Sequence, residues 1–321
     1  VFAKQFMRRH RVPTADCEIC EDAETARRVV RSGRFGFPLV VKADGLAAGK
    51  GVIIAPDAAT ALSAIDDVMV ARQFGDAGDR LLLEECLQGP EVSVFVLADG
   101  TGATAFHTAQ DHKRALDDDR GPNTGGMGAF APSPLVDRAL ADRIRDEVIA
   151  PTIAGMRVEG RPFCGFLYAG LMLTPDGPKV LEFNARLGDP EAQVVLPMLD
   201  EDLAPLLLDA AAGQLNRSSC RFLDGARVGV VVASAGYPGD YAKGKVITGL
   251  DAATTDAGAL VFHSGTTTRD GAVVTAGGRV LTVVGAGSDY RTAMSRAYDG
   301  VKKISFEGMR YRTDIGRKAI T

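Results

Sequence analysis

The spacing of apolar residues predicts that the chain opens inside an amphipathic helix. Phe2, Phe6 and Met7 recur at helical spacing, so residue 1 already belongs to that element. A second helix is expected at 21–33, with a glycine at its end, and a third at 58–71, capped by the aspartate that precedes it. These three helices alternate with apolar runs of a different kind.

Those runs predict strands, because they are short, rich in branched residues and bounded by turn residues. The predicted strands of the first hundred residues are 13–20, which opens with a turn, then 37–44, 51–55, 80–86 and 91–99. A glycine-rich loop joins the second of them to the third. An order of strand, loop, strand, helix and strand is typical of an α+β unit, so the expected fold class is α+β.

The rest of the chain changes character twice. Residues 101–135 show little periodicity and many specific polar residues, so we predict a long functional loop there. Further elements are expected as helices at 137–150 and 201–212 and as strands at 165–173 and 178–186. From about residue 221 short valine-rich strands precede a helix at 289–303. We therefore predict one domain over 1–220 and a separate β-rich domain over 221–321.

Composition narrows the possible partners. Of the 321 residues, 46% are hydrophobic and 24% are charged, as in ordinary globular proteins. A net charge of −4 and 6% aromatic residues without tryptophan argue against nucleic-acid binding. No apolar run approaches a membrane span and no signal peptide is evident, so we expect a cytoplasmic protein with no membrane partner. Five scattered cysteines fit reduced thiols better than disulfides.

The segment "VVKADGLAAGKGV" at 40–52 combines two lysines with several glycines. A P-loop needs four residues between its first glycine and its Gly-Lys pair, and then Ser or Thr. Here three residues separate Gly45 from Gly49, and Gly51 follows Lys50. Because glycine amides can still approach an anion closely, we predict a phosphate-contacting loop without the P-loop arrangement.

The strand at 178–186 carries a candidate metal site. Its period of two places Leu181 and Phe183 on one face, and Glu182 and Asn184 on the other, with Arg186 following them. A carboxylate and an amide oxygen two residues apart suit Mg²⁺, whose other ligands can be phosphates and water. A strand with one solvated polar face is the alternative interpretation.

A candidate adenine site follows the strand at 80–86. Glu84, Glu85 and Leu87 form a short hinge whose backbone groups could face an adenine edge, and Glu91 could accept the ribose hydroxyls. The pattern alone is weak, because paired glutamates at a strand end are more often a solvated terminus.

Two polar motifs lie in the predicted long loop. "DHKR" at 111–114 supplies cations and a carboxylate, and "NTGGMGA" at 123–129 supplies glycine amides that can cradle an anion. Each alone is typical of an ordinary surface loop, but their joint presence favours a substrate site. The segment at 186–193 then places Asp189 and Glu191 next to the proposed metal face.

Other kinds of chemistry are disfavoured by what the sequence lacks. Among the four histidines only His112 lies in a charged candidate site, and no nucleophile elbow or HExxH helix occurs. Cys17 and Cys20 form a single CxxC without the second pair that a zinc site needs. Zinc hydrolysis and catalysis by a Ser or Cys nucleophile are therefore not expected.

Taken in order, these motifs resemble the glycinamide ribonucleotide synthetase family of purine synthesis, which has the ATP-grasp fold. The resemblance runs from residue 1 to the end and includes "EECLQGPEVS", "AQDHKR", "GPNTGGMGA", "VLEFNARLGDPEAQ" and the tail "YRTDIGRKAI". It implies two α+β subdomains that clasp ATP, the smaller at about 20–95, followed by a small β-rich C-terminal domain. It also implies ligation of glycine to 5-phosphoribosylamine through glycyl phosphate, by a monomer.

The resemblance also implies a role for each candidate residue. ATP would contact Lys42, Gly45, Gly49, Lys50, Gly51, Glu84, Glu85, Leu87 and Glu91. Magnesium or manganese would bind Glu182 and Asn184. The glycine and phosphoribosylamine sites map onto Asp111, Lys113, Asn123, Thr124, Gly125, Gly126, Met127, Arg186 and Asp189. Lys50 and Arg186 would also stabilise the charge of the transferring phosphoryl group.

Three departures from the family pattern qualify this picture. We expect the family's N-terminal substrate domain, and an ATP-contacting lysine just before Val1, to be missing, and the chain does not begin with methionine. Leu187 replaces a usual phenylalanine, and "LYAGLML" lacks the acidic residue of many ATP-grasp enzymes. Two alternatives stay open: a ligase for another acid and amine, and a non-catalytic ATP-binding fragment.

Overall fold

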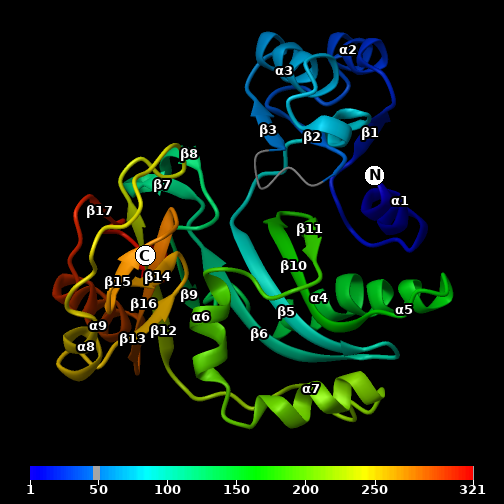
Figure 1. Cartoon of the computed structure of the whole chain (residues 1–321). Helices are drawn as coiled ribbons and strands as arrows, with labels where there is room; N and C mark the ends of the chain where they lie inside the picture. The colour runs from blue at the N-terminus through cyan, green and yellow to red at the C-terminus, as the bar shows by residue number, and fades with distance from the viewer. Residues whose placement is uncertain (46–50, 321) are drawn as a thin grey trace. The chain divides into compact units, whose positions relative to one another are not determined.

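The computed structural model of the chain describes residues 1–45 and 51–320 (Figure 1). Contacts divide the protein into two compact units. The first contains residues 1–91, 142–161 and 170–183, and the second contains 92–141, 162–169 and 184–321. Among the described residues, no helix is both long and apolar enough to cross a membrane.

The first unit is built on a four-stranded antiparallel sheet in the order β1-β4-β2-β3. Its strands are β1 (Cys17–Cys20), β2 (Leu39–Ala43), β3 (Val52–Ala55) and β4 (Leu81–Glu85). Helices α2 (Ala23–Ser32) and α3 (Ala58–Ile65) lie side by side on this sheet (Figure 1). They bury its apolar positions in a core that includes Val30, Val41 and Ile65. Helix α1 (Phe2–Arg9) precedes the sheet.

Capping residues set the ends of these helices as the sequence predicts. Asp57 accepts a hydrogen bond from the Thr60 amide at 2.8 Å and begins α3. Gly33 ends α2 in the left-handed conformation, with φ of 69°, which glycine adopts without strain. Beyond Ile65, α3 continues as a π-helical turn at Asp66–Val70. The expected third helix is therefore present in two parts.

The second unit contains the longer strands. Their hydrogen-bonded order is β5-β6-β9-β12-β16-β13, and β17 pairs with β12. Their bounds are β5 (Glu91–Asp99), β6 (Ala103–Asp111), β9 (Gly128–Ala131), β12 (Ala226–Ser234), β13 (Leu260–His263), β16 (Arg279–Gly287) and β17 (Met309–Arg310). Two separate hairpins consist of β7 (Arg114–Leu116) with β8 (Arg120–Asn123), and β14 (Thr266–Arg269) with β15 (Ala272–Thr275).

Two helical layers cover opposite faces of this sheet. Phe130 packs with α9 (Tyr290–Lys303), while its neighbours Ala129 and Ala131 pack with α6 (Glu191–Val195). Because successive strand residues point to opposite faces, α9 and α6 lie on different sides of β9. The remaining helices are α7 (Leu203–Ala212) and α8 (Leu250–Thr255).

Some segments have residues in both units. Strands β10 (Cys164–Thr174) and β11 (Gly177–Asn184) are divided between them. Helix α4 (Arg138–Ile144) runs through a π-helical turn at Arg145–Ile149 into α5 (Ala150–Val158), so the predicted helix at 137–150 ends later than expected.

The prediction of a long loop over 101–135 was wrong. Strands β6, β7, β8 and β9 lie in that range. Buried positions in β6 include Thr104 and Phe106, two residues apart on one face of the strand. One of these two buried residues is thus small and polar. Because alanines and threonines fill much of the strand, its period of two gives little hydrophobic contrast in the sequence.

Candidate functional site

A buried cluster of charges lies where β2 and β4 pair. Lys42, on β2, places its Nζ 2.9 Å from Oε2 of Glu84, on β4. The same Nζ donates a hydrogen bond to the Leu181 carbonyl at 3.3 Å. Glu84 is only 2% exposed, so its carboxylate is almost fully removed from water. The sequence predicted both residues at the nucleotide site, and the structure brings their side chains together.

A second lysine completes this cluster, and the sequence analysis missed it. Lys4 of α1 is 4% exposed, and its Nζ lies 3.2 Å from Oε1 of Glu84. It also donates hydrogen bonds to Thr14 Oγ1 at 2.7 Å and to the Ala15 carbonyl at 3.0 Å. Burial lowers the pKa of Lys4, against the raising effect of Glu84. A lysine inside an amphipathic helix is usually exposed, so the sequence carried no signal for this contact.

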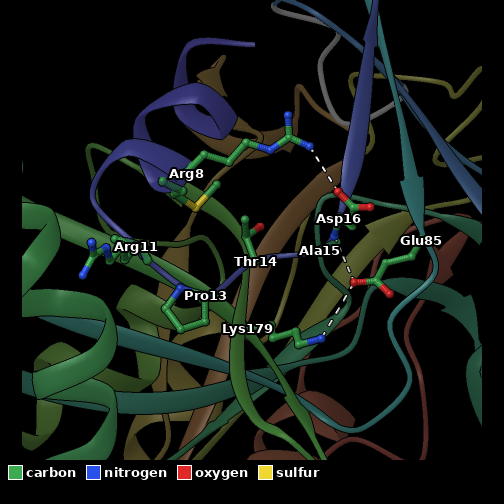
Figure 2. Close-up of a pocket in the computed structure, with 10 residues that line it drawn as sticks. Arg8, Arg11, Pro13, Thr14, Ala15, Asp16, Glu85 and Lys179 are labelled. Carbon is green, nitrogen blue, oxygen red and sulfur yellow. Dashed lines mark hydrogen bonds and ion pairs between the residues drawn. The ribbon is translucent and has the colours of Figure 1, made fainter.

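Glu85, predicted beside Glu84 at the nucleotide site, turns its side chain toward a different surface. It lines a pocket of about 440 Å³ together with Arg8, Pro13 and Thr14, among others. Figure 2 shows these side chains. The Asp16 amide donates to Glu85 Oε1 at 2.9 Å, and Lys179 Nζ lies 3.8 Å from the same oxygen. The structure thus assigns partners to the Glu85 side chain within this pocket, and the Glu85 amide donates to the Asp16 carbonyl at 3.1 Å.

The hinge after β4 is held by a close backbone approach. Leu173 donates its amide to the Pro90 carbonyl at 2.9 Å. Gly89 has φ of 147°, and a Cβ there would lie 2.1 Å from the Leu173 carbonyl oxygen, so only glycine fits. Leu87 is half-buried and Glu91 is exposed at the start of β5. The predicted adenine and ribose contacts therefore lie on a segment with a fixed backbone.

The glycine stretch joins two antiparallel strands, as predicted. Lys42 pairs with Val52 across β2 and β3, and the Ala43 amide donates to the Gly51 carbonyl at 2.9 Å. Gly45 packs closely, because a Cβ there would lie 2.7 Å from the Ala77 Cβ. The predicted contacts Gly49 and Lys50 lie outside the described residues. A P-loop leads from a strand into a helix, so this strand-to-strand connection has a different architecture.

The predicted metal ligands occupy the end of β11. Glu182 is exposed and Asn184 is half-buried, two residues apart on the strand. Within residues 1–45 and 51–320, no group of three or more His, Cys, Asp or Glu side chains is placed to hold a metal ion. The pair nevertheless fits Mg²⁺, because this ion is commonly held by one or two protein oxygens together with phosphates and water.

In the second unit, the two polar motifs predicted to share a site are hydrogen-bonded neighbours. The Thr124 amide donates to the Lys113 carbonyl, and the Met127 amide donates to the His112 carbonyl, both at 2.8 Å. Lys113 Nζ lies 3.8 Å from Asp111 Oδ1. The backbone ladder therefore holds residues 111–113 beside the glycine loop at 123–127.

His112 does not belong to the polar side of this ladder. It is 1% exposed, packs edge-on against Phe130, and neither ring nitrogen has a hydrogen-bond partner among the described residues. Burial lowers its pKa to about 4, with a further lowering by Arg312. Strand alternation thus sends His112 into the core, away from the side chains of Asp111 and Lys113.

Arg279 ties the glycine loop to Asp189, and the sequence analysis missed it. Its Nη1 donates to the carbonyls of Gly125 and Asp189, both at 2.7 Å, and its Nη2 lies 3.0 Å from Asp189 Oδ2. A Cβ on Gly126 would lie 2.4 Å from Pro190 Cδ, so glycine permits the contact between the two segments. Asn123 and Arg186, also predicted here, are exposed.

Glu191, at the start of α6, is buried next to the segment that carries Asp189. It is 4% exposed, and its Oε1 lies 3.2 Å from Ser93 Oγ. Burial and the charge of Asp111 raise its pKa to about 7. Strand-face reasoning could not place it, because Glu191 begins a helix after a turn.

The comparisons with known proteins agree with one family along the chain. Residues 1–192 match the family described as phosphoribosylglycinamide synthetase, ATP-grasp (A) domain. Residues 227–318 match phosphoribosylglycinamide synthetase, C domain. The match covers both the charged cluster of the first unit and the β-rich end of the second.

Individual relatives give the same result. Phosphoribosylamine–glycine ligase of Chlorobaculum tepidum is 49% identical over 321 residues, which is 100% of this chain and 75% of that protein. The trifunctional purine biosynthetic protein adenosine-3 of Gallus gallus is 50% identical over 320 residues, and the chain spans 32% of its length. The crystal structure of phosphoribosylamine–glycine ligase from Thermotoga maritima matches with a TM-score of 0.89 at 35% identity, covering 98% of this chain and 77% of that one.

Proposed function

The chain belongs to the phosphoribosylglycinamide synthetase family and has its ATP-grasp fold, and from that premise we propose which of its residues carry out the family's reaction. The reaction is the ATP-dependent ligation of glycine to 5-phosphoribosylamine in purine synthesis. The proposed residues fall into three groups: nucleotide contacts, metal ligands and substrate contacts.

The first unit supplies the nucleotide contacts. Lys42 reaches the phosphates, and the glycine loop from Gly45 to Gly51 covers them. The backbone of Glu84 and Leu87 faces the adenine, and Glu91 accepts the ribose hydroxyls. Support comes from the buried position of Glu84, which holds the Lys42 ammonium at 2.9 Å, so that this cation keeps one orientation.

Glu182 and Asn184 are the residues that would hold Mg²⁺ or Mn²⁺. When bound, the ion neutralises charge on the phosphates during phosphoryl transfer. The chain's own contribution is the placement of two oxygen donors on one strand. Lys42 adds positive charge for the phosphoryl group, a role that the family resemblance also gives to Lys50 and Arg186.

The second unit supplies the groups for glycine and phosphoribosylamine. They comprise Asp111, Lys113, the loop at 123–127, Arg186 and Asp189. The observation that carries the assignment is the backbone ladder between residues 111–113 and this loop. It brings the Asp111 carboxylate and the Lys113 ammonium beside the loop, and these are the two charges that an amine and an anionic phosphate need. The alternative acid and amine pair has no such observation in its favour.

Chemically, the reaction needs an activated carboxylate. The glycine carboxylate attacks the γ-phosphorus of ATP, which gives glycyl phosphate and ADP. The phosphoribosylamine nitrogen then attacks the acyl carbon, the C–O bond to phosphate breaks, and phosphate leaves with the electron pair. No covalent enzyme intermediate is needed, so the protein acts by positioning its substrates and neutralising charge.

The assay that tests this proposal follows ADP release and product formation by the full chain with Mg-ATP, glycine and freshly generated phosphoribosylamine. We expect ADP formation that depends on both substrates. ADP release that ignores glycine would overturn the substrate assignment. Binding of ATP without any turnover would support the alternative of a non-catalytic ATP-binding fragment.

Asp111→Asn tests the second unit directly. We expect kcat/KM for phosphoribosylamine to fall by about 10²-fold or more, because a charged contact to the amine is lost, while the affinity for ATP stays within about twofold. Asp224→Asn is the matched control, since Asp224 is exposed and lies outside both proposed sets. Equal effects of the two substitutions would contradict the assignment of Asp111.

A further inference from the structure

A buried polar cluster lies behind Asp111, and no step of the proposed function uses it. It consists of Glu191, at the start of α6, Ser93 of β5 and Tyr168 of β10. Ser93 Oγ lies 3.2 Å from Glu191 Oε1 and 3.1 Å from Tyr168 Oη. All three are at most 4% exposed, so their polar atoms are removed from bulk water.

The loop that carries Asp189 rests directly on the Glu191 carboxyl group. A Cβ on Gly188 would lie 2.5 Å from Glu191 Oε2, and the Ala192 amide donates to the Gly188 carbonyl at 2.9 Å. A larger residue at 188 would have to displace the buried Glu191 carboxyl group. The buried cluster of Glu191 therefore packs directly against the segment that carries Asp189, a proposed substrate contact.

Asp111 and Lys113 act on the pKa of Glu191 in opposite directions. Asp111, at the end of β6, raises the pKa of Glu191, while Lys113 and the Ser93 hydroxyl lower it. Burial adds the largest upward effect and brings the pKa to about 7. Lys113 itself lies 3.8 Å from Asp111 Oδ1. Ser93 pairs with Ala109 across β5 and β6, and Asp111 lies two residues beyond Ala109 on the same face of β6. Asp111 and the Glu191 carboxyl group, which contacts Ser93, therefore lie on one side of the sheet, in a setting that disfavours two negative charges.

A purely structural role explains this arrangement poorly. Glutamine would fill the same volume and accept the same Ser93 hydrogen bond without any charge to bury. A glutamate in this place adds a group that can gain or lose a proton near the pH at which the amine reacts. This difference between glutamate and glutamine indicates that the proton of Glu191 has a role in the reaction.

We propose that Asp111 and Glu191 act as a carboxyl pair that accepts the proton lost by the phosphoribosylamine nitrogen. This inference rests on the proposed function, which puts Asp111 in contact with the substrate. The N–C bond forms, the C–O bond to phosphate breaks, phosphate leaves with the electron pair, and the proton passes from nitrogen to the pair. Asp111 is the catalytic residue, and Glu191 is a positioning residue that sets its proton affinity.

The test compares pH profiles, because a structural defect lowers activity without moving them. Initial rates of the full chain are measured at saturating Mg-ATP and glycine over about pH 6 to 8. Dividing each variant's kcat/KM for phosphoribosylamine by the wild-type value at the same pH cancels the titration of the substrate itself.

For Glu191→Gln we expect this ratio to fall about tenfold from pH 6 to 8, because the wild type gains activity as the pair ionises near pH 7 and the variant does not. Ser93→Ala should move the wild-type midpoint to higher pH, since the lost hydrogen bond stabilises the carboxylate. Asp224→Asn is the control, because Asp224 is an exposed carboxylate outside this cluster, and its ratio should stay constant.

A ratio for Glu191→Gln that is constant with pH, or that follows Asp224→Asn, would overturn the proposal. Where Glu191→Gln fails to fold, Ser93→Ala decides, and an unshifted midpoint would overturn it equally. Wild-type chain that releases no glycine-dependent ADP would refute the proposed function instead, so the two failures are distinguishable.

Discussion

Glu84 and Glu191 are buried to nearly the same extent in surroundings of opposite charge. Glu84, in the first unit, is 2% exposed and has Lys42 at one carboxylate oxygen and Lys4 at the other. Glu191, in the second unit, is 4% exposed and is faced by a hydroxyl and the charge of Asp111. The same side chain is thus the anion of an ion cluster in one unit and part of an acid pair in the other.

The difference shows that burial alone does not decide what a carboxyl group does. Removing a carboxylate from water is costly, and nearby cations can offset that cost. Where burial and a neighbouring carboxylate outweigh the effect of a nearby cation, the neutral form is favoured instead and the pKa rises. Nucleotide binding needs a fixed cation, and amide formation needs a group that can take a proton. Each unit has the arrangement that suits its proposed task.

Removing the charge of Glu84 should produce the largest effect. Glu84→Gln leaves Lys4 buried without a counter-charge, so we expect a loss of about 3–5 kcal/mol in the free energy of unfolding. Urea denaturation measures this loss. Glu24→Gln is the control, because Glu24 is 66% exposed and its pairs with Arg27 and Arg31 should contribute less than about 1 kcal/mol. A loss as small as that of the control would show that the cluster stabilises nothing.

Glu191→Gln should change stability in the opposite direction, and only at high pH. The folded pKa of Glu191 is raised from 4.5 to about 7, so its stabilising contribution is complete below the unfolded value and is lost as pH rises through 7. Relative to wild type, the variant should therefore gain a few kcal/mol between about pH 5 and pH 8. Urea denaturation at both pH values gives the difference. A pH-independent difference would mean that Glu191 does not titrate in this range.

Parts of both units could be predicted because local chemistry determines them. The strand that presents Lys42, the glycine connection to the next strand and the Asp57 cap follow from periodicity and turn residues, and all are present. The joint location of 111–113 and the glycine loop was also predicted correctly. The proposed site residues, the division at residue 220, the monomeric state and the cytoplasmic location stay predictions.

The missed features depend on contacts between distant parts of the sequence. Lys4 and Glu84 are brought together by the packing of α1, and Arg279 reaches Asp189 from a strand 90 residues away. Neither contact can be predicted from local periodicity, because a single charged residue on a helix or strand is expected to be exposed to solvent. The predicted loop at 101–135 failed for a different reason, namely the low hydrophobic contrast of β6.

The smallest effect is expected at Glu85, which differs from Glu84 by one position and by its access to water. Its side chain is 38% exposed and lies 3.8 Å from Lys179 Nζ. Solvent and salt screen such a pair, so Lys179→Ala should cost about 0–1 kcal/mol, less at high salt than at low salt. Urea denaturation at two salt concentrations measures it, with Lys302→Ala as a control on another exposed pair. A salt-independent loss as large as that of Glu84→Gln would contradict the distinction between buried and exposed partners, because Glu85 keeps its hydrogen bond from the Asp16 amide in the variant.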